Sequence, residues 1–402
     1  LMMIKTVKTD DVLKVYLSGR IDSNNAQQTE NDISADIAKY PGEVPVFDAE
    51  GLEYISSAGL RVLLKFRKQF STKLDVINVS SDVYDIFSVT GFNELLNVKK
   101  KLREVSIEGC PVIGGGTYST VYRLDPETII KVYDKHNISL EKIESEQKNS
   151  REVFLHDIPT AIAYDIVKIG GLYGSLYEML DAGTVSATLR QHPERLEELS
   201  LKTAHLMKKL HTTEFEPGTF PDSRDICREY TAKLHELGLI TAEENTFMNT
   251  ALDRIPYKNT FVHGDFHPNN IMVCGGDLML IDIGDASLGD PMFDLGISYT
   301  HFIRLARSSA EHGLDVHERI IGLNHKVLGA MWEIIIPEYF GTSDREILAR
   351  NNELISNYSS FLMMEMLPVM LKSPASEGKK AVMKQLVSSM LEAADKLTHI
   401  TR

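Results

Sequence analysis

The sequence is short of cysteine, and that shortage excludes two kinds of small protein. Cys110, Cys227 and Cys274 are odd in number, widely spaced and contain no Cys-x-x-Cys pair. This usage excludes a disulfide framework and a cysteine-based zinc site, and it is typical of a reducing compartment. We therefore expect a cytoplasmic protein.

Long apolar runs are also missing. No window of about 18 uninterrupted apolar residues occurs in the chain, which excludes an ordinary membrane-spanning helix. Residues 1–5 have neither the charged segment nor the following apolar run of a signal peptide. These features predict a soluble, unexported protein, and we expect translation to start at Met2 or Met3.

Positive charge is scarce, since 43 Lys and Arg stand against 57 Asp and Glu and give a net charge of −14. A surface this acidic repels phosphate backbones and anionic lipid, so we expect neither a nucleic-acid nor a membrane partner. The deficit belongs to one part of the chain: residues 1–104 carry 14 basic and 15 acidic side chains, and residues 105–402 carry a net charge of −13. Length and charge together predict more than one domain.

Residues 1–104 alternate short apolar runs with amphipathic stretches. Apolar periodicity predicts strands over 12–17, 44–48 and 73–79, and helices over 25–40, 57–70 and 83–89. This β-α-β-α-β-α order predicts a small α/β domain in which helices pack on a sheet. A β-rich patch over 97–107 leads into a different pattern, and we place the domain boundary between residues 104 and 105.

Residues 105–402 begin β-rich and become mostly helical. A helix is predicted over 140–155, and amphipathic stretches follow over 195–211 and 323–336, with a Met-rich stretch over 356–371. We divide this region into a smaller lobe, 105–180, and a larger helical lobe, 181–402. Small ligands commonly bind where two such lobes join.

The smaller lobe contains a glycine cluster and an unusual lysine. Glycines at Gly114 and Gly116 allow a hairpin to approach a polyphosphate closely, and Val121 would pack under a flat base, although a simple turn is the alternative. Lys131 lies on an otherwise apolar strand, where a buried ammonium needs an anionic partner. That partner is Glu146 or, alternatively, Glu144; a lysine that extends from an edge strand to solvent is the structural alternative.

The larger lobe contains a polar loop between apolar strands, from His263 through Asp265 to Asn270. A carboxylate there can accept a proton from a hydroxyl nucleophile, and the amide oxygen five residues later can help to hold a metal. Asp282 ends the next apolar strand and offers a hard oxygen ligand for Mg²⁺. His263 and His267 could instead ligate a transition metal with Asp265, but no second cluster completes the set, so we expect His263 to shape the loop by bonding its backbone.

Residues 108–300 resemble the aminoglycoside phosphotransferase and choline kinase superfamily, the small-molecule relatives of protein kinases. His263-x-Asp265-x4-Asn270 matches their His-x-Asp-x4-Asn loop, and Asp282-Ile283-Gly284 stands where protein kinases have Asp-Phe-Gly. The resemblance implies an α+β, two-lobed protein-kinase-like fold with ATP and Mg²⁺ as cofactors. It implies that Asp265 is the catalytic base and that Asn270 and Asp282 bind Mg²⁺.

The same resemblance implies a nucleotide site in the smaller lobe. Lys131, paired to Glu146, would contact the α- and β-phosphates, and the Glu178 carbonyl and Leu180 amide would take the adenine edge. The glycine loop would contribute Gly114, Gly116, Ser119 and Val121, with Ser119 standing at the third glycine position. The acidity of this region is compatible with a cationic acceptor, and charge dispersed for solubility is the alternative.

Residues 3–100 resemble the sulfate transporter and anti-sigma factor antagonist (STAS) domain. The resemblance lies in residues 46–60 and in Gly19-Arg20-Ile21-Asp22. Ser57 falls on the position that is phosphorylated in bacterial antagonists, while Ser56 replaces the frequent aspartate before it and is expected to cap a helix. A helix N-terminus also stabilises an added phosphate.

Two functions from different classes follow. In the first, the chain is an ATP- and Mg²⁺-dependent phosphotransferase that phosphorylates a hydroxyl of a small molecule (aminoglycoside-, choline- or sugar-like), and the STAS domain regulates it or docks an anti-sigma-like protein partner. In the second, the chain is a signalling switch whose kinase-like domain phosphorylates Ser57 or a partner protein. The His-x-Asp loop lacks the arginine and lysine usual in peptide-directed kinases, which favours the first.

Overall fold

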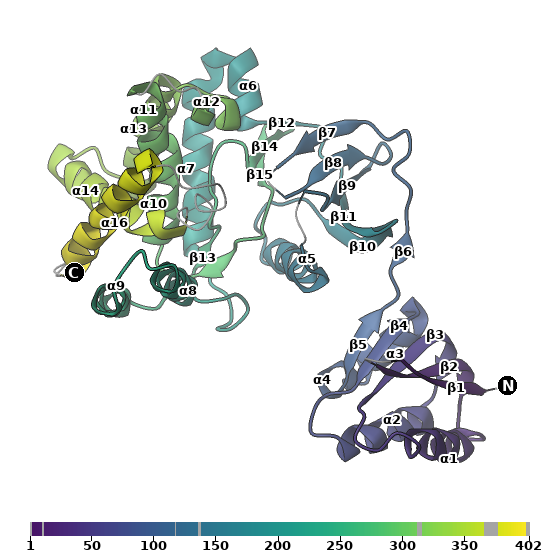
Figure 1. Ribbon diagram of the computed structural model, residues 1–402. Coiled ribbons are helices and arrows are strands. Elements are labelled where there is room, and N and C mark those ends of the chain that lie inside the picture. Colours follow the sequence, from purple (N-terminus) through teal and green to yellow (C-terminus); the bar gives the residue numbers. More distant parts are fainter. Residues whose placement is uncertain are drawn as a thin grey trace. The chain divides into compact units, whose positions relative to one another are not determined.

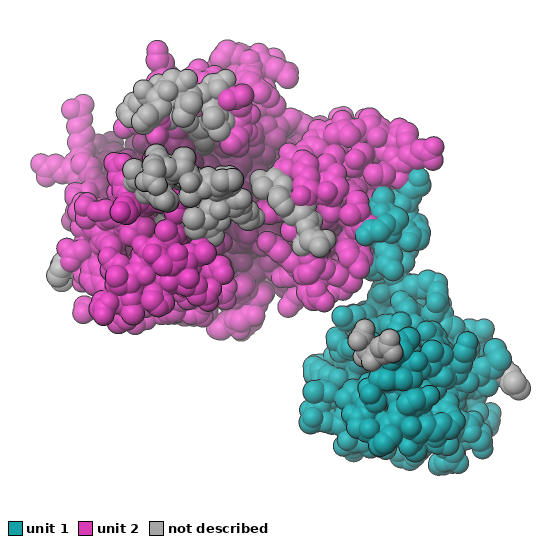
Figure 2. Space-filling model, viewed as in Figure 1, with its two compact units in different colours: residues 1–106, 167–171 teal, residues 107–166, 172–402 magenta. Residues whose placement is uncertain are grey.

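The computed structural model describes residues 2–9, 12–116, 118–135, 138–311, 316–365 and 377–398. The chain forms two compact units (Figure 2): unit 1 holds residues 1–106 with 167–171, and unit 2 holds residues 107–166 with 172–402. Among the described residues, no helix is both long enough and apolar enough to cross a membrane.

Unit 1 is an α/β unit whose sheet has the strand order β1-β2-β3-β4-β5 (Figure 1). The strand β1 is antiparallel to β2, and the remaining neighbours are parallel. Its elements are β1 (Met3–Lys8), β2 (Leu13–Ile21), α1 (Ala26–Ile37), β3 (Pro45–Ile55), α2 (Ser57–Gln69), β4 (Asp75–Val79), α3 (Ser81–Val89), α4 (Phe92–Leu95), β5 (Asn97–Lys100) and β6 (Arg103–Glu104).

The structure corrects the predicted strand order in one respect. The expected β-α-β-α-β-α series omits β1, which precedes it and lies at the edge of the sheet. The sequence of this strand lacks the continuous apolar run that marks a buried strand, and in the structure none of its residues is fully buried. It is held instead by pairing with β2, from Met3 opposite Ser18 to Lys8 opposite Leu13.

The helix α2 starts where a buried strand ends. Ser56 caps it, because its Oγ accepts a hydrogen bond from the Gly59 backbone N–H at 3.4 Å. Gly59 lies so close to the sheet that a Cβ there would be 2.7 Å from the side chains of both Ile21 and Ile55. The first turn of α2 is thereby fixed on the sheet, and Ser57 in that turn is exposed.

Unit 2 begins with a mixed, largely antiparallel sheet and one long helix. Its elements are β7 (Val112–Gly115), β8 (Thr120–Arg123), β9 (Thr128–Val132), α5 (Leu140–Leu155), β10 (Ala163–Ile169) and β11 (Leu172–Glu178). The sheet order is β6-β10-β11-β9-β8-β7; the short β6 runs parallel to the end of β10, with Arg103 opposite Val167, and these paired residues both belong to unit 1. Ser139 caps α5 by accepting from the Lys142 N–H, and α5 spans the predicted range.

The rest of unit 2 is mostly helical (Figure 1). Its strands are β12 (Gly183–Thr184), β13 (Phe261–Val262), β14 (Ile271–Cys274), β15 (Asp277–Leu280) and β16 (Ser287–Leu288). Its helices are α6 (Val185–Gln191), α7 (Leu196–Thr212), α8 (Ser223–Glu236), α9 (Ala242–Arg254), α10 (Met292–Tyr299), α11 (Leu305–Glu311), α12 (Val316–Ile321), α13 (His325–Phe340), α14 (Arg345–Leu362) and α16 (Glu377–Thr398), with short turns of helix at Pro193–Arg195, Thr300–Arg304 and Met363–Glu365. The end of the predicted Met-rich stretch, 366–371, lies outside the described residues.

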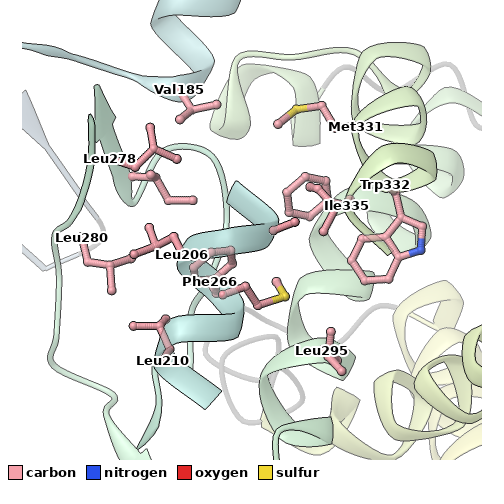
Figure 3. Packing of buried hydrophobic residues seen from close by; sticks show 14 of the residues in the cluster. Val185, Leu206, Leu210, Phe266, Leu278, Leu280, Leu295, Met331, Trp332 and Ile335 are labelled. Atoms are coloured by element: carbon pink, nitrogen blue, oxygen red, sulfur yellow. The ribbon is translucent and has the colours of Figure 1, made fainter. Parts of the chain in front are cut away.

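The core of unit 2 forms around α7. Figure 3 shows Leu206 and Leu210 of α7 between the β14–β15 strands, with Leu278 and Leu280, and α13, with Trp332 and Ile335. Phe266, one residue after the predicted base, is fully buried in this cluster. The polar loop is thus attached to the core through an apolar side chain.

Candidate functional site

Lys131 of β9 lies between two carboxylates. Its Nζ is 2.6 Å from Oε1 of Glu146 on α5 and 2.9 Å from Oδ1 of Asp282 after β15. Burial alone would lower the pKa of Lys131, but the charges of Asp282 and Glu146 outweigh it and hold that pKa well above its ordinary value. Of the two glutamates considered from the sequence, Glu144 is exposed and Glu146 makes the pair.

Two tyrosines also hydrogen-bond to Glu146. The hydroxyl of Tyr133 donates to Oε2 at 3.1 Å, and the hydroxyl of Tyr177 donates to Oε1 at 3.4 Å. Burial and the nearby charge of Glu146 raise the pKa of both phenols, so both remain protonated donors. A buried carboxylate needs several donors, and here it receives an ammonium and two hydroxyls.

The glycine loop joins β7 to β8. Gly114 pairs with Val121 across these strands, and Val121 in turn lies opposite Lys131 on β9. The Gly116 N–H donates to the Ser119 carbonyl at 3.0 Å, and Lys135 donates to the Gly116 carbonyl at 2.8 Å. Ser119 is buried, whereas Gly114 and Gly116 are exposed and a Cβ at Gly116 would meet no atom within 4 Å.

The end of β11 and the residues after it include Glu178 and Leu180, whose backbone groups are predicted to bind the base edge. The Met179 N–H donates to the Glu127 carbonyl at 2.8 Å, toward the β9 side of the strand. Since alternate residues of an extended strand direct their backbone groups to opposite sides, Glu178 directs its groups away from β9. In agreement, the Glu178 N–H donates to the Ile162 carbonyl at 2.9 Å on that opposite side.

A tight hairpin brings Asn270 and Asp282 into neighbouring positions. The strands β14 and β15 pair from Ile271 opposite Leu280 to Cys274 opposite Asp277, so the turn holds only Gly275 and Gly276. Both glycines have positive φ, 56° and 98°, as a two-residue turn of this kind requires. The open end of the hairpin then closes with the Ile281 N–H donating to the Asn270 carbonyl at 3.0 Å.

The polar loop is held by a buried aspartate. Asp294 of α10 accepts from the backbone N–H of His263 at 2.7 Å and of Gly264 at 2.9 Å, and it lies 3.2 Å from Nε2 of His211. His263 is fully buried; its Nδ1 accepts from the Asp265 N–H at 3.2 Å and its Nε2 lies 3.2 Å from the Ile281 carbonyl. His263 therefore links the loop to the segment that carries Asp282, in a structural role.

Asp265 is contacted on both carboxylate oxygens. Nδ2 of Asn270 donates to Oδ2 at 3.0 Å, Nε2 of His267 lies 3.3 Å from the same oxygen, and Nε2 of His301 lies 3.3 Å from Oδ1. Desolvation by the surrounding protein would raise the pKa of Asp265, but the two imidazoles outweigh it and hold that pKa well below its usual range. The carboxylate is therefore ionised at neutral pH.

These three side chains also meet the distance requirement of a metal site, since the ligand atoms of Asp265, His267 and His301 lie within 4.8 Å of one another. The hydrogen bonds argue against it. The Asn269 N–H donates to Nδ1 of His267 at 3.2 Å, so neutral His267 carries its proton on Nε2, the atom that a metal would need. A metal-bound histidine instead donates through its other nitrogen.

Sequence reasoning missed two titratable groups near Asp265. His301 belongs to the turn after α10, and Glu365 ends the short turn Met363–Glu365. Desolvation and the charges of Asp285, Asp265 and Asp294 raise the pKa of Glu365 to about 8. Neither residue lies in a recognisable motif, and both are brought near the loop by helix packing alone.

Comparison with known proteins assigns both units. The sequence model of the phosphotransferase enzyme family matches residues 109–317, and that of the STAS domain matches residues 3–105. The chain therefore belongs to the phosphotransferase enzyme family and carries an N-terminal STAS domain. Its fold is an α/β STAS domain followed by an α+β, two-lobed protein-kinase-like domain, as predicted.

Individual relatives each match part of the chain. The Bordetella bronchiseptica protein named "Putative anti-sigma factor antagonist BtrV" is 35% identical over 100 residues, 24% of this chain and 85% of that protein. The structure of ADP-bound aminoglycoside phosphotransferase APH(2'')-Ib is 16% identical, with a TM-score of 0.47 over 71% of this chain and 94% of that one. A choline/ethanolamine kinase family protein from Mesorhizobium loti is 15% identical, with a TM-score of 0.41 over 71% and 92%.

Proposed function

We propose that this protein transfers the γ-phosphate of ATP, in the presence of Mg²⁺, to a hydroxyl group of a small molecule. The acceptor would be aminoglycoside-, choline- or sugar-like, and the STAS domain would regulate the enzyme or dock a protein partner. Membership of the phosphotransferase family supports the reaction class. The observation that carries the proposal is that Lys131, Glu146 and Asp282, which are far apart in the sequence, form one ion-paired group.

Each residue of the predicted nucleotide site would have one task. Lys131 would neutralise the nucleotide phosphates, and Glu146, held by Tyr133 and Tyr177, would keep the ammonium in place. The backbone groups of Glu178 and Leu180 would bind the base edge, and Val121 would pack against it. The exposed Gly114 and Gly116 would let phosphate oxygens approach the loop that Ser119 closes.

The residues present fit a magnesium ion. Asp282 offers a half-exposed carboxylate, and the hairpin places Asn270 across from Ile281, beside it. Nδ2 of Asn270 donates to the backbone carbonyl and to the carboxylate of Asp265, at 2.9 and 3.0 Å. The amide oxygen of Asn270 therefore points away from Asp265 and is the atom that would ligate the ion. Oxygen ligands of this kind suit Mg²⁺, which would neutralise charge on the transferred phosphate.

Asp265 would orient the acceptor hydroxyl and accept its proton. The low pKa of this carboxylate means that it is ionised and ready to accept a hydrogen bond from the hydroxyl. A weak base suffices because the hydroxyl proton becomes acidic only as the bond to phosphorus forms, in a loose transition state where positioning dominates.

The test is ATP consumption by the full chain with Mg²⁺ and a broad panel of hydroxylated metabolites and antibiotics. We expect at least one compound to accelerate ADP formation. Asp265→Asn should lower that rate by about 100- to 10,000-fold, the usual contribution of a general base, while Mg²⁺-ADP still binds. Asp277→Asn, an exposed aspartate of β15, is the matched control. No acceleration by any compound, or an active Asp265→Asn variant, would overturn the proposal.

A second candidate function is the signalling switch. Ser57 is exposed in the first turn of α2, where Ser56 rather than Ser57 caps the helix, so the Ser57 hydroxyl is accessible to a kinase. Incubation with labelled ATP alone distinguishes the candidates. Label on Ser57 that disappears in Ser57→Ala and Asp265→Asn favours the switch, and label absent from Ser57 removes the form of it in which the chain phosphorylates its own STAS domain.

A further inference from the structure

His301 contacts the proposed base from outside every motif in the sequence. It lies in the π-helical turn Thr300–Arg304, which continues α10 into α11. Such turns are rare and frequently occur at functional sites, since the extra residue redirects side chains from the regular helical face. Here Nε2 of His301 reaches to 3.3 Å from Oδ1 of Asp265.

The contacts of Asp265 divide between its two oxygens. Oδ2 receives Nδ2 of Asn270 and faces Nε2 of His267, whereas Oδ1 faces His301. Without His301 the carboxylate would be held through Oδ2 alone, and these contacts would have to resist any rotation about its Cβ–Cγ bond by themselves. With it, both oxygens have a defined position.

The protonation of the imidazoles follows from their partners. Nδ1 of His267 accepts from the Asn269 N–H, so Nε2 carries the proton that faces Asp265. A carboxylate oxygen can only accept, so Nε2 of His301 must also carry a proton. Desolvation lowers the pKa of His301, which makes it a neutral donor rather than a cation. The two rings also contact each other, with centroids 4.8 Å apart.

We propose that His301 is a positioning residue, which through Nε2–H holds Oδ1 of Asp265 so that the carboxylate keeps one orientation toward the acceptor hydroxyl. This inference rests on the proposed function. A displacement of about 1 Å at a reacting group can lower a rate by about 100-fold, so the effect should appear in kcat rather than in nucleotide binding.

The experiment compares His301→Phe, which keeps a ring but no donor, with His301→Gln, which restores an N–H near the position of Nε2. The probe is Mg²⁺-ATP, with water or the panel acceptor receiving the phosphate. We expect His301→Phe to lower kcat about 10- to 100-fold with KM for ATP within about twofold, and His301→Gln to recover most of the loss. In an Asp265→Asn background, His301→Phe should have no further effect. His205→Phe, at an exposed histidine of α7, is the control.

Three results would overturn the inference: unchanged kcat in His301→Phe, an equal loss in His301→Gln, or an equal additional loss in the Asp265→Asn background. Nitrogen-15 spectra of labelled histidine separate this failure from that of the proposed function. The Nε2–H resonance of His301 should shift in Asp265→Asn, and its failure to shift overturns the contact itself. Absence of turnover in the wild-type chain overturns the proposed function, and with it the catalytic role of His301.

Discussion

Gly264, between His263 and Asp265, is the position where one added methyl group should do most damage. Its φ is +83°, and a Cβ there would lie 2.4 Å from the backbone carbonyl oxygen of Asp285. Real Cβ atoms do not approach a carbonyl oxygen so closely. In Gly264→Ala, either the polar loop or the segment that carries Asp282 and Asp285 must therefore move.

The loss of stability that we expect for Gly264→Ala has two parts. A left-handed conformation costs a residue with a Cβ about 1–2 kcal/mol, and forced repacking adds about 1–3 kcal/mol. Gly218 separates them, because its φ is +88° and a Cβ there would meet nothing within 4 Å. Gly218→Ala should lose only the first part, so Gly264→Ala should exceed it by about 1–3 kcal/mol, or about 2–6 °C in the unfolding midpoint of a unit this large.

The single tryptophan makes the assay specific for one unit. Trp332 is buried in α13 of unit 2, so fluorescence excited at the indole band reports the unfolding of that unit alone within the full chain. Thermal or urea unfolding of wild type, Gly218→Ala and Gly264→Ala is compared on this signal. The reasoning is refuted if the two alanine variants lose the same stability, because the close approach to Asp285 would then carry no energy.

Three further predictions concern ionisable groups. Lys131→Met should weaken Mg²⁺-ADP binding by at least about tenfold, or 1.4 kcal/mol, as measured by titration calorimetry. Tyr133→Phe removes a hydroxyl donor from the buried carboxylate of Glu146, so the free energy of unfolding, followed by Trp332 fluorescence, should fall by about 1.5–3 kcal/mol. The folded-state pKa of Glu365 is raised to about 8, so the fold favours the neutral form of this side chain. The free energy of unfolding should therefore fall as pH rises from about 4.5 through 8, where the side chain becomes charged. Glu365→Gln should have the same unfolding midpoint as wild type near pH 5 and a higher one near pH 9.

Local patterns predicted the parts of the fold that depend on neighbouring residues. The helix α5 spans the range its apolar periodicity gives, and the Ser56 cap follows from a serine placed where a buried strand meets a helix. The Gly275-Gly276 turn between apolar strands is a hairpin signal of the same kind. It was available in the sequence and explains why Asn270 and Asp282 lie side by side.

Tertiary packing decides which side chains pair with Lys131 and Glu146. Glu144 and Glu146 are two residues apart on α5 and project from different faces of the helix, so only the docking of α5 on β9 selects Glu146 for Lys131. Of the tyrosines that support Glu146, Tyr133 directly follows β9 and Tyr177 belongs to β11, and both hydroxyls reach the same carboxylate although the two residues are not opposite each other in the sheet. Neither relationship has a period or spacing that could be read from the sequence.

The sequence by itself determined the two domains, the uneven charge, the order of the phosphotransferase motifs and the backbone forms that glycine and capping residues permit, because each depends on composition or on residues close along the chain. Only the tertiary structure decided which distant side chains lie near Asp265. His301 follows it by 36 positions and Glu365 by 100, and they approach because the short helical turns that carry them pack on the two hydrophobic clusters of unit 2. Side chains that meet through packing leave no local pattern, so no reading of the sequence could have found them.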